Sequence, residues 1–414
     1  MQTRLTDGFR NTRDGAVADA VLRACVHCGF CNAACPTYRL LGDERDGPRG
    51  RIYLIKQVLE GAAATQRTQT HLDRCLSCRA CETACPSGVE YGKLLEIGRE
   101  VVERDAGRPW IERVQRAALR AILPYPRRFA PLLALARAAQ PLLPVEWQRK
   151  LPAPRRALSW PARRHARHMV ALNGCVQSVT APGIDTAAAR VLDVLGISLV
   201  HAAASGCCGA LSQHLAGRDK GFGFARRNID AWWPEVERGA EAIVVTASGC
   251  AVTVKDYGRL LRDDPVYAAK AARVAAMTKS LVEVLASEPI TVFAGKLSGR
   301  VAFHAPCTLQ HGQRLAGRVE GLLTQAGLDL VPVVDAQMCC GSAGSYSLLQ
   351  PTVAARLLAD KIAALECGQP ELILTDNIGC LLHLQSGTKT PVKHWIEVLA
   401  ESIATNGDFD AYPG

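Results

Sequence analysis

The sequence predicts a multidomain α+β protein in which a helical, cysteine-bearing domain is followed by two copies of one α/β unit. Three observations lead to this prediction: two four-cysteine runs before residue 86, an Arg- and Pro-rich segment after them, and a cysteine spacing that occurs twice in the second half. We therefore expect domains at 1–103, 169–290 and 300–405, with a linker at 104–168.

Cysteine content sets the first constraint on function. The 414 residues include 17 cysteines, and the first twenty residues contain no apolar stretch of the kind found in export signals. No run approaches the roughly 18–20 apolar residues of a transmembrane helix. Disulfides are rare in reducing compartments, where patterned cysteines usually bind metals or carry out redox chemistry. We therefore expect a cytoplasmic protein whose cysteines are functional.

The first domain carries two cysteine runs of identical spacing, C-x2-C-x2-C-x3-C-P. This is the spacing of bacterial two-cluster ferredoxins, in which three close cysteines bind one [4Fe–4S] cubane and the fourth crosses to the other cubane. The prediction is one cluster on Cys25, Cys28, Cys31 and Cys85, and a second cluster on Cys75, Cys78, Cys81 and Cys35.

Two other interpretations of these runs are weaker. Zinc sites more often use paired CxxC knuckles than a four-cysteine run followed by proline, and disulfides do not suit the compartment. The gap between the runs contains a helical pattern at 50–63, RGRIYLIKQVLEGA. The length of the gap and this pattern favour a helical ferredoxin-type domain.

The linker holds the chain's excess positive charge. Residues 104–168 contain fourteen Arg and one Lys against three acids, whereas the whole chain has a formal charge of +10. Prolines divide the linker into short helical stretches at 110–123 and 131–140. The first stretch has an apolar face and a basic face, which are Ile111, Val114, Ala118 and Ala121, and Arg113, Arg116 and Arg120, respectively.

Three interpretations of this basic segment remain open. Residues 109–140 could lie on an anionic membrane surface, dock a partner, or pack on the protein with the Arg face in water. Nucleic-acid binding is not expected, because the segment lacks interleaved aromatic residues and any recognised binding motif.

The second half of the chain is an internal duplication. The first copy contains Cys175, Cys207, Cys208 and Cys250, and the second contains Cys307, Cys339, Cys340 and Cys380, at offsets of 132, 132, 132 and 130 residues. Chance does not produce such agreement, so the spacing indicates a repeat. Cys367 belongs to neither set and is expected to be structural.

Each cysteine site of the repeat ends a β-like run, and helical stretches at 185–195 and 353–365 lie between the runs. The runs are HMVALNGC, ISLVHAAASG and AIVVTASGC in the first copy, and RVAFHAPC, LVPVVDAQM and LILTDNIGC in the second. Alternating strands and helices predict βαβ units and a mostly parallel sheet, whose ligands gather at the carboxyl ends of the strands. We therefore expect each copy's four cysteines to converge at one edge.

Each vicinal cysteine pair precedes a glycine, which permits a turn that branched residues resist. The paired thiols could bind a metal or act as a dithiol, and the alternative is that they are small buried hydrophobic residues. His304 and His311 flank Cys307, and His383 follows Cys380 by three residues. His383 could replace a thiolate ligand, although a loop histidine with its own hydrogen bonds is the simpler interpretation.

The Cys-Cys-Gly (CCG) pattern resembles the cysteine-rich domain of heterodisulfide reductase subunits. In those proteins the last cysteine belongs to a CxxC, and the set can hold an additional [4Fe–4S] cluster. Here Thr253 and His383 stand at the position of the second CxxC cysteine. This departure leaves cluster binding by the two CCG sets open and argues against disulfide-reductase catalysis.

The order of a double ferredoxin motif, a linker and two CCG domains is similar to the iron–sulfur subunits of glycolate oxidase (glycolate dehydrogenase). Local matches are DERDGPRGRIYLIKQVLEG (43–61), SGCAVTVKDYG (248–258), HAPCTLQHGQ (304–313), CCGSAGSYSLLQP (339–351) and TDNIGC (375–380). The resemblance implies an electron-transfer subunit whose FAD-binding partner subunits oxidise glycolate to glyoxylate, with D-lactate as a further substrate. This chain has no strand–GxGxxG–helix fingerprint, so we expect no flavin on it.

The leading hypothesis is therefore that electrons pass from a partner's flavin through two [4Fe–4S] clusters to a quinone-level or other acceptor. The chain would work in the cytoplasm, with residues 109–140 available for contact with the inner membrane. An equivalent subunit of another flavin dehydrogenase, of the glycerol-3-phosphate type, is the second hypothesis. A stand-alone disulfide reductase and a metal-stabilised scaffold without a redox role are further alternatives.

Overall fold

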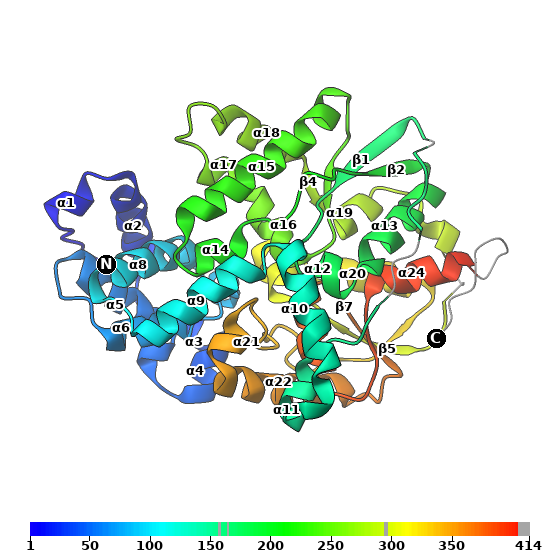
Figure 1. The fold of residues 1–414 in the computed structure, drawn as a ribbon. Coiled ribbons are helices and arrows are strands. Elements are labelled where there is room, and N and C mark those ends of the chain that lie inside the picture. Colours follow the sequence, from blue (N-terminus) through cyan, green and yellow to red (C-terminus); the bar gives the residue numbers. More distant parts are fainter. Residues whose placement is uncertain (156–158, 164, 294–296, 405–414) are drawn as a thin grey trace.

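The computed structural model describes residues 1–155, 159–163, 165–293 and 297–404. A helical N-terminal region and two four-stranded parallel sheets make up this part of the chain (Figure 1), so the predicted α+β class is confirmed. The expected end of the second copy at residue 405 lies outside the described residues, as do linker residues 156–158 and 164.

Helices build the N-terminal region, which Figure 1 shows at one end of the molecule. Their bounds are α1 (Asp7–Arg10), α2 (Arg13–Ala24), α3 (Phe30–Ala33), α4 (Pro36–Leu41), the 3₁₀ turn η1 (Glu44–Asp46), α5 (Pro48–Leu59), α6 (Gln66–Asp73), α7 (Ala80–Thr83) and α8 (Tyr91–Ala106). The helix expected at 50–63 is α5, which begins at Pro48 because proline is pre-organised for a first helical position.

Close packing of α5 on α8 forms the core of this region. A Cβ atom on Gly98 would lie 2.6 Å from Cγ1 of Ile55, so only glycine allows this approach. The buried core includes Leu22 and Leu94, and three of its members are cysteines, Cys25, Cys75 and Cys81. The apolar side chains of the helices and the cysteines of the two loops therefore belong to one core.

The linker folds into α9 (Trp110–Ile122), α10 (Pro126–Ala138), the 3₁₀ turn η2 (Gln140–Leu142) and α11 (Val145–Lys150). The second expected helix begins five residues earlier than predicted and continues through Pro131. One interpretation of the linker was that it packs on the protein with its Arg face in water, and α9 does not pack in this way at Arg116. Arg116 is buried and donates to Asp73 at 3.0 Å, whereas Ile111 and Val114 are exposed. None of the helices in the described part of the chain has the length and apolarity that a bilayer crossing requires.

The first CCG copy is a parallel sheet in the order β2-β1-β3-β4. Its strands are β1 (Arg167–Ala171), β2 (Ile197–His201), β3 (Ile243–Val245) and β4 (Thr278–Ser280). Its helices are α12 (Gln177–Thr180), α13 (Gly183–Val194), α14 (Ala210–His214), α15 (Arg218–Glu237), α16 (Ser248–Lys255), α17 (Tyr257–Leu260), α18 (Ala268–Met277), α19 (Leu281–Leu285) and η3 (Ile290–Phe293). The helix expected at 185–195 is α13.

The second copy has the equivalent strand order, β6-β5-β7-β8, which supports the duplication. Its strands are β5 (Arg300–His304), β6 (Asp329–Leu330), β7 (Leu372–Thr375) and β8 (Val392–His394). Its helices are the π-helical turn η4 (Thr308–Gly312), α20 (Arg318–Ala326), α21 (Tyr346–Leu349), α22 (Pro351–Glu366), α23 (Ile378–Gln385) and α24 (Trp395–Ala404). Of the predicted run LVPVVDAQM, only its first residue, Leu330, belongs to the two-residue strand β6, because Pro332 lacks the N–H that a longer strand needs.

The two copies meet through corresponding segments that start α16 and α23. The amide of Ser248 donates to the carbonyl of Asp376 at 3.1 Å, and Nδ2 of Asn377 donates to Oγ of Ser248 at 3.3 Å. Nε2 of His394 lies 2.9 Å from the carbonyl of Thr246. The copies thus form one body, and the N-terminal region packs against both of them (Figure 1).

Candidate metal centres

The two cysteine runs form loops of the same backbone shape. His27 and Gly29 in the first loop, and Ser77 and Arg79 in the second, have positive φ angles of 58°, 90°, 54° and 60°. A left-handed conformation costs a non-glycine residue roughly 1–2 kcal/mol, and it persists only where the surrounding structure determines it. The repeated shape therefore shows that the two loops are built for the same task.

The first group of thiols surrounds one cavity. Cys25, Cys28, Cys31 and Cys85 all line it, together with apolar side chains that include Ile52. Burial, and then the neighbouring Cys25, raise the pKa of Cys31 to about 11. All 17 cysteines are free thiols. Four free thiols around a largely apolar cavity are the donor set that a cubane requires, so the residues fit a [4Fe–4S] cluster.

The second group of thiols lies deeper. Burial and the adjacent Cys307, Cys35 and Cys75 raise the pKa of Cys78 well above its usual value. Burial and the same N-terminal thiols raise the pKa of Cys81 in the same way. Cys35, Cys75, Cys78 and Cys81 are therefore neighbours, and Cys81 also lines the first cavity. The two groups adjoin, and the second also fits a [4Fe–4S] cluster.

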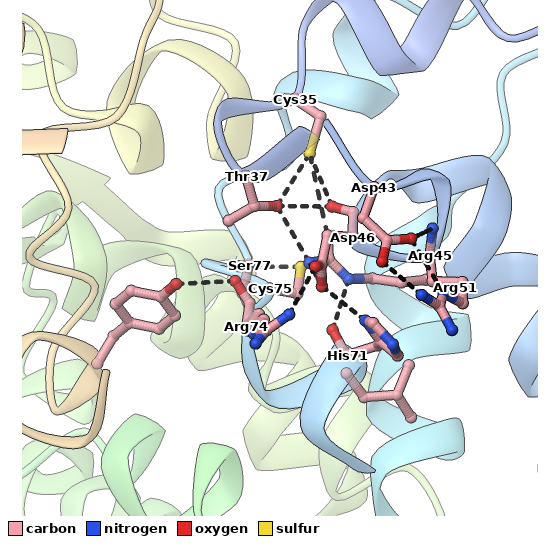
Figure 2. Close-up of polar contacts among 12 residues, drawn as sticks. Cys35, Thr37, Asp43, Arg45, Asp46, Arg51, His71, Arg74, Cys75 and Ser77 are labelled. Atoms are coloured by element: carbon pink, nitrogen blue, oxygen red, sulfur yellow. Dashed lines mark hydrogen bonds and ion pairs between the residues drawn. The ribbon is translucent and has the colours of Figure 1, made fainter. Parts of the chain in front are cut away.

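A buried cation, Arg51, lies against the second group (Figure 2). The residue is 0% exposed, its Nη1 lies 3.9 Å from Sγ of Cys35, and its Nη2 donates to Oγ1 of Thr37 at 3.1 Å. Burial opposes ionisation of Cys75, but Arg51 and Arg99 outweigh it and lower the pKa of that thiol. Arg51 thus places positive charge beside the thiolates that a cluster needs.

Asp46 holds this cation in place (Figure 2). Its Oδ1 lies 2.9 Å from Nδ1 of His71 and 3.6 Å from Nη2 of Arg51, and its Oδ2 accepts from Nη1 of Arg74 at 2.8 Å. The carbonyl of His71 in turn accepts from Nε of Arg51 at 2.7 Å. Our sequence analysis missed this network. The available signal was the dense run of charges DERDGPRGR at 43–51, between the two cysteine runs.

The cysteines of the second copy converge beside the second group of the N-terminal region. Cys307 follows β5 and its thiol lies against that of Cys339, which raises the pKa of Cys307 together with burial. Cys340 lies next to Cys380, in the first turn of α23. Cys339 also packs in one apolar cluster with Cys78 and Leu76. The structure therefore joins the second copy's set to the N-terminal thiols, a contact that the sequence did not indicate.

The cysteines of the first copy also converge, but among different neighbours. The thiol of Cys175 lies against that of Cys207, and the thiol of Cys208 against that of Cys250. The hydroxyl of Tyr257 donates to the carbonyl of Cys208 at 2.8 Å. The groups that most shift the pKa values of Cys175, Cys207 and Cys208 lie within the first copy itself.

The glycines after both vicinal pairs have the turn that the sequence predicted. Gly209 and Gly341 have φ angles of 94° and 89°, and a Cβ on either would lie 2.8 Å from a carbonyl oxygen, that of Gly221 or Ala354. Only glycine therefore fits these positions. Each turn places both thiols of its pair within the converging set.

The three histidines noted in the sequence have different surroundings. His311 bridges segments, with Nδ1 3.1 Å from Oγ1 of Thr83 and Nε2 3.1 Å from the carbonyl of Gln337. Among the residues that the structure describes, the buried Nε2 of His383 has no hydrogen-bond partner. His304 is buried beside Cys340 and Cys380, and neither of its ring nitrogens has a partner among those residues. The sequence raised a ligand role only for His383 and favoured a loop histidine there, whereas the structure places His304 in the cysteine set.

Comparisons with known protein families match both halves of the chain. Residues 21–89 match the 4Fe-4S dicluster domain, and residues 169–255 and 301–385 match the cysteine-rich domain. The glycolate oxidase iron–sulfur subunit of Escherichia coli (strain K12) is 52% identical over 97% of this chain and 99% of that protein. The probable glycolate oxidase iron–sulfur subunit of Bacillus subtilis (strain 168) is 29% identical over 88% of each chain. Lactate utilization protein A of an Exiguobacterium species is 29% identical over 55% of this chain and 95% of that protein.

Proposed function

Because this chain belongs to the family of glycolate oxidase iron–sulfur subunits, we propose that it carries electrons away from FAD-binding partner subunits that oxidise glycolate to glyoxylate. D-lactate is a second substrate class for those partners. The observation that carries the proposal is the pair of adjoining thiol groups in the N-terminal region. The electron-transfer role belongs to residues 1–103, and the CCG copies at 169–290 and 300–405 support it.

Eight cysteines would hold the two clusters. Cys25, Cys28, Cys31 and Cys85 form the first ligand set, and Cys35, Cys75, Cys78 and Cys81 form the second. Bound [4Fe–4S] clusters supply one-electron carriers, which a flavin that has accepted two electrons requires for its stepwise reoxidation. Arg51 and Arg99 lie beside the second set and favour its ionised thiolates.

Electrons would enter at the first set. Cys28 is an exposed cysteine, whereas Cys35, Cys75 and Cys81 are buried. Val26 and Phe30, which flank Cys28 in the loop, are each 67% exposed. Exposed apolar residues around a site commonly mark a protein–protein contact. This loop is therefore the face that we assign to the flavin partner.

Electrons would leave from the second set toward the second CCG copy, whose Cys307 and Cys339 adjoin Cys78. The acceptor that we propose is a quinone, reached from that side of the molecule. Three of the four cysteines of the second set are buried, which limits the access of partners that approach the first set.

The test uses the purified complex under anaerobic conditions, with Cys28→Ser and Cys78→Ser as variants. We expect glycolate to reduce the partner's flavin as before, while quinone reduction falls at least 100-fold. Cys367→Ser is the matched control, since Cys367 is exposed and lies outside both sets. Unchanged quinone reduction in both cluster variants would contradict the proposed electron transfer through the clusters. Flavin reduction by glycerol 3-phosphate in place of glycolate would assign the chain to the other dehydrogenase class.

We also propose that α9 and α10 rest on the cytoplasmic face of an anionic membrane. Trp110 is 71% exposed, and Ile111, Val114, Leu132 and Leu135 are exposed as well. Arg113, Arg127 and Arg128 supply exposed positive charge on the same helices. Exposed tryptophan and aliphatic side chains beside arginines are typical of helices that bind the membrane interface.

Vesicle co-sedimentation tests this membrane contact. The complex should bind vesicles with anionic lipid and lose most of that binding in Trp110→Ser/Leu135→Ser. Binding to neutral vesicles should be weaker, because electrostatic attraction is missing. Unchanged vesicle binding combined with loss of the flavin subunits in the double variant would assign the surface to partner docking instead.

A further inference from the structure

His304, Cys340 and Cys380 bring three metal-binding atoms together in the second copy. One ring nitrogen and the two sulfurs lie within 4.8 Å of one another. His304 is the last residue of β5, Cys340 belongs to the Cys-Cys-Gly turn, and Cys380 lies in the first turn of α23 after β7. The carboxyl ends of parallel strands share one edge, which explains why residues so far apart in the sequence meet.

The imidazole of His304 has no hydrogen-bond partner among the described residues. The residue is 1% exposed, and neither Nδ1 nor Nε2 makes a hydrogen bond within the described part of the chain. An unsatisfied buried polar group costs roughly 1–3 kcal/mol, and such groups in native proteins call for a specific explanation. The nitrogen that approaches the two sulfurs would be satisfied by a metal ion bound between them.

The first copy provides an internal comparison. Leu172 precedes Cys175 by three residues, as His304 precedes Cys307, so the first copy has four cysteines without the imidazole. If these cysteines served packing alone, both copies could carry an apolar residue at this position. The histidine is therefore a feature of the second copy that its packing does not require.

We propose that the second copy binds one thiolate-preferring transition-metal ion, zinc or iron, through His304, Cys340 and Cys380. Metal–sulfur bonds of about 2.3 Å and metal–nitrogen bonds of about 2.0 Å place tetrahedral ligands roughly 3.5–3.8 Å apart, which agrees with the 4.8 Å limit on the observed atoms. Two thiolates and an imidazole select these metals over magnesium or calcium. Cys339 and Cys307 lie beside the three ligands and adjoin Cys78.

A buried lysine lies near the two proposed thiolate ligands. Lys361 is 3% exposed, and its Nζ donates to the carbonyl of Asp335 at 2.9 Å. Its ammonium group lies close enough to Cys340 and Cys339 to interact electrostatically with their sulfurs. A lysine near two thiolates partly balances their charge. The proposed ion lies outside the two ferredoxin-type sets and does not depend on the proposed substrate.

The experiment measures metals and acid-labile sulfide per chain in the anaerobically purified complex. The wild type should contain one zinc or iron ion beyond eight irons and eight sulfides. His304→Gln and Cys340→Ser should lose that ion and keep the eight irons. His383→Gln and Cys208→Ser are the controls, because His383 lies outside the three-ligand set and Cys208 lies in the first copy; both should retain it.

A wild type with eight irons and no further metal would overturn the proposal, and so would an additional ion that His304→Gln retains. Four further irons accompanied by four sulfides would indicate a cluster in place of the single ion, and this result would also overturn the proposal. Since a buried substitution can unfold the chain, the wild type gives an independent measure. X-ray absorption at the zinc edge, or Mössbauer spectroscopy of a mononuclear iron, should show mixed sulfur and nitrogen ligation; an all-sulfur shell would exclude His304.

Discussion

Replacing Arg51 by Gln is expected to lower the reduction potential of the centre that Cys35, Cys75, Cys78 and Cys81 would hold. The substitution removes a unit positive charge whose Nη1 lies 3.9 Å from Sγ of Cys35. Reduction adds an electron, so loss of a nearby cation makes the reduced state less favourable.

Coulomb's law gives the scale of the effect. At an effective dielectric constant of about 20, two unit charges about 4 Å apart interact by roughly 4 kcal/mol. For a one-electron couple about 1.4 kcal/mol corresponds to about 59 mV, so the upper limit is near 170 mV. The added electron is spread over the whole cluster, and Arg99 remains, so we expect a shift of about 50–150 mV to lower potential.

EPR-monitored redox titration of the purified complex measures this shift. Arg51→Lys keeps the charge and should change the potential by less than half as much. Arg45→Gln removes an arginine whose partner, Asp43, lies 2.7 Å away on the partly exposed surface, and it should leave the potential unchanged.

The outcome that contradicts this reasoning is a potential within about 20 mV of the wild type in Arg51→Gln, in a preparation that retains eight irons. The same variant should unfold at lower temperature. Removing one partner from a buried ionic network costs roughly 3–5 kcal/mol, and Asp46 would lose one of its cations. Iron and sulfide content must therefore accompany every titration.

Three further perturbations test other parts of the structure. Gly98→Ala should destabilise the N-terminal region by roughly 1–3 kcal/mol, because no space exists for a methyl group. Gly223→Ala, at a helical position with open space, should instead raise the thermal midpoint. Equal effects of the two substitutions would contradict the close packing of α5 on α8. Burial raises the pKa of Asp185 to about 6 from 3.8, so the folded state binds more protons than the unfolded state, and its stability falls as pH rises from about 4 to about 6. Asp185→Asn should remove this loss of stability, which amounts to roughly 3 kcal/mol. Parallel pH profiles of the thermal midpoint in the wild type and the variant would refute the assignment. Tyr91→Phe removes a hydroxyl 3.6 Å from Sγ of Cys75 and should lower the potential of that centre by some tens of mV, since hydrogen bonds to sulfur stabilise the reduced cluster; an upward shift in redox titration would count against it.

Sequence reasoning succeeded where a pattern was repeated. The C-x2-C-x2-C-x3-C-P runs and the offsets of 132 and 130 residues predicted a helical domain and two parallel sheets, and both are present. Strands β1 and β7 were predicted because they contain short apolar runs, MVA at 169–171 and LIL at 372–374, that lead toward a cysteine. A repeated spacing survives divergence of the residues between the fixed points, which is why it identified the fold class so well.

Other features follow from contacts that no local pattern records. Strand β4 has the sequence TKS and carries no alternation or apolar run, so only its pairing with β3 identifies it. The inward orientation of Arg116 depends on Asp73, which lies 43 residues earlier. A helical wheel places arginine toward water by default, whereas an ion pair with a carboxylate that is only 12% exposed reverses that preference here.

The cysteines of the N-terminal core link protein folding to the supply of iron and sulfide. Cys25, Cys75 and Cys81 pack among Leu22, Ile55 and Leu94, so cysteines that would hold the clusters are also members of the hydrophobic core. Inserting inorganic sulfide and iron is then part of folding. A cell that is short of iron would accumulate incompletely folded chains, which proteases remove. The abundance of this subunit would therefore fall when iron is scarce.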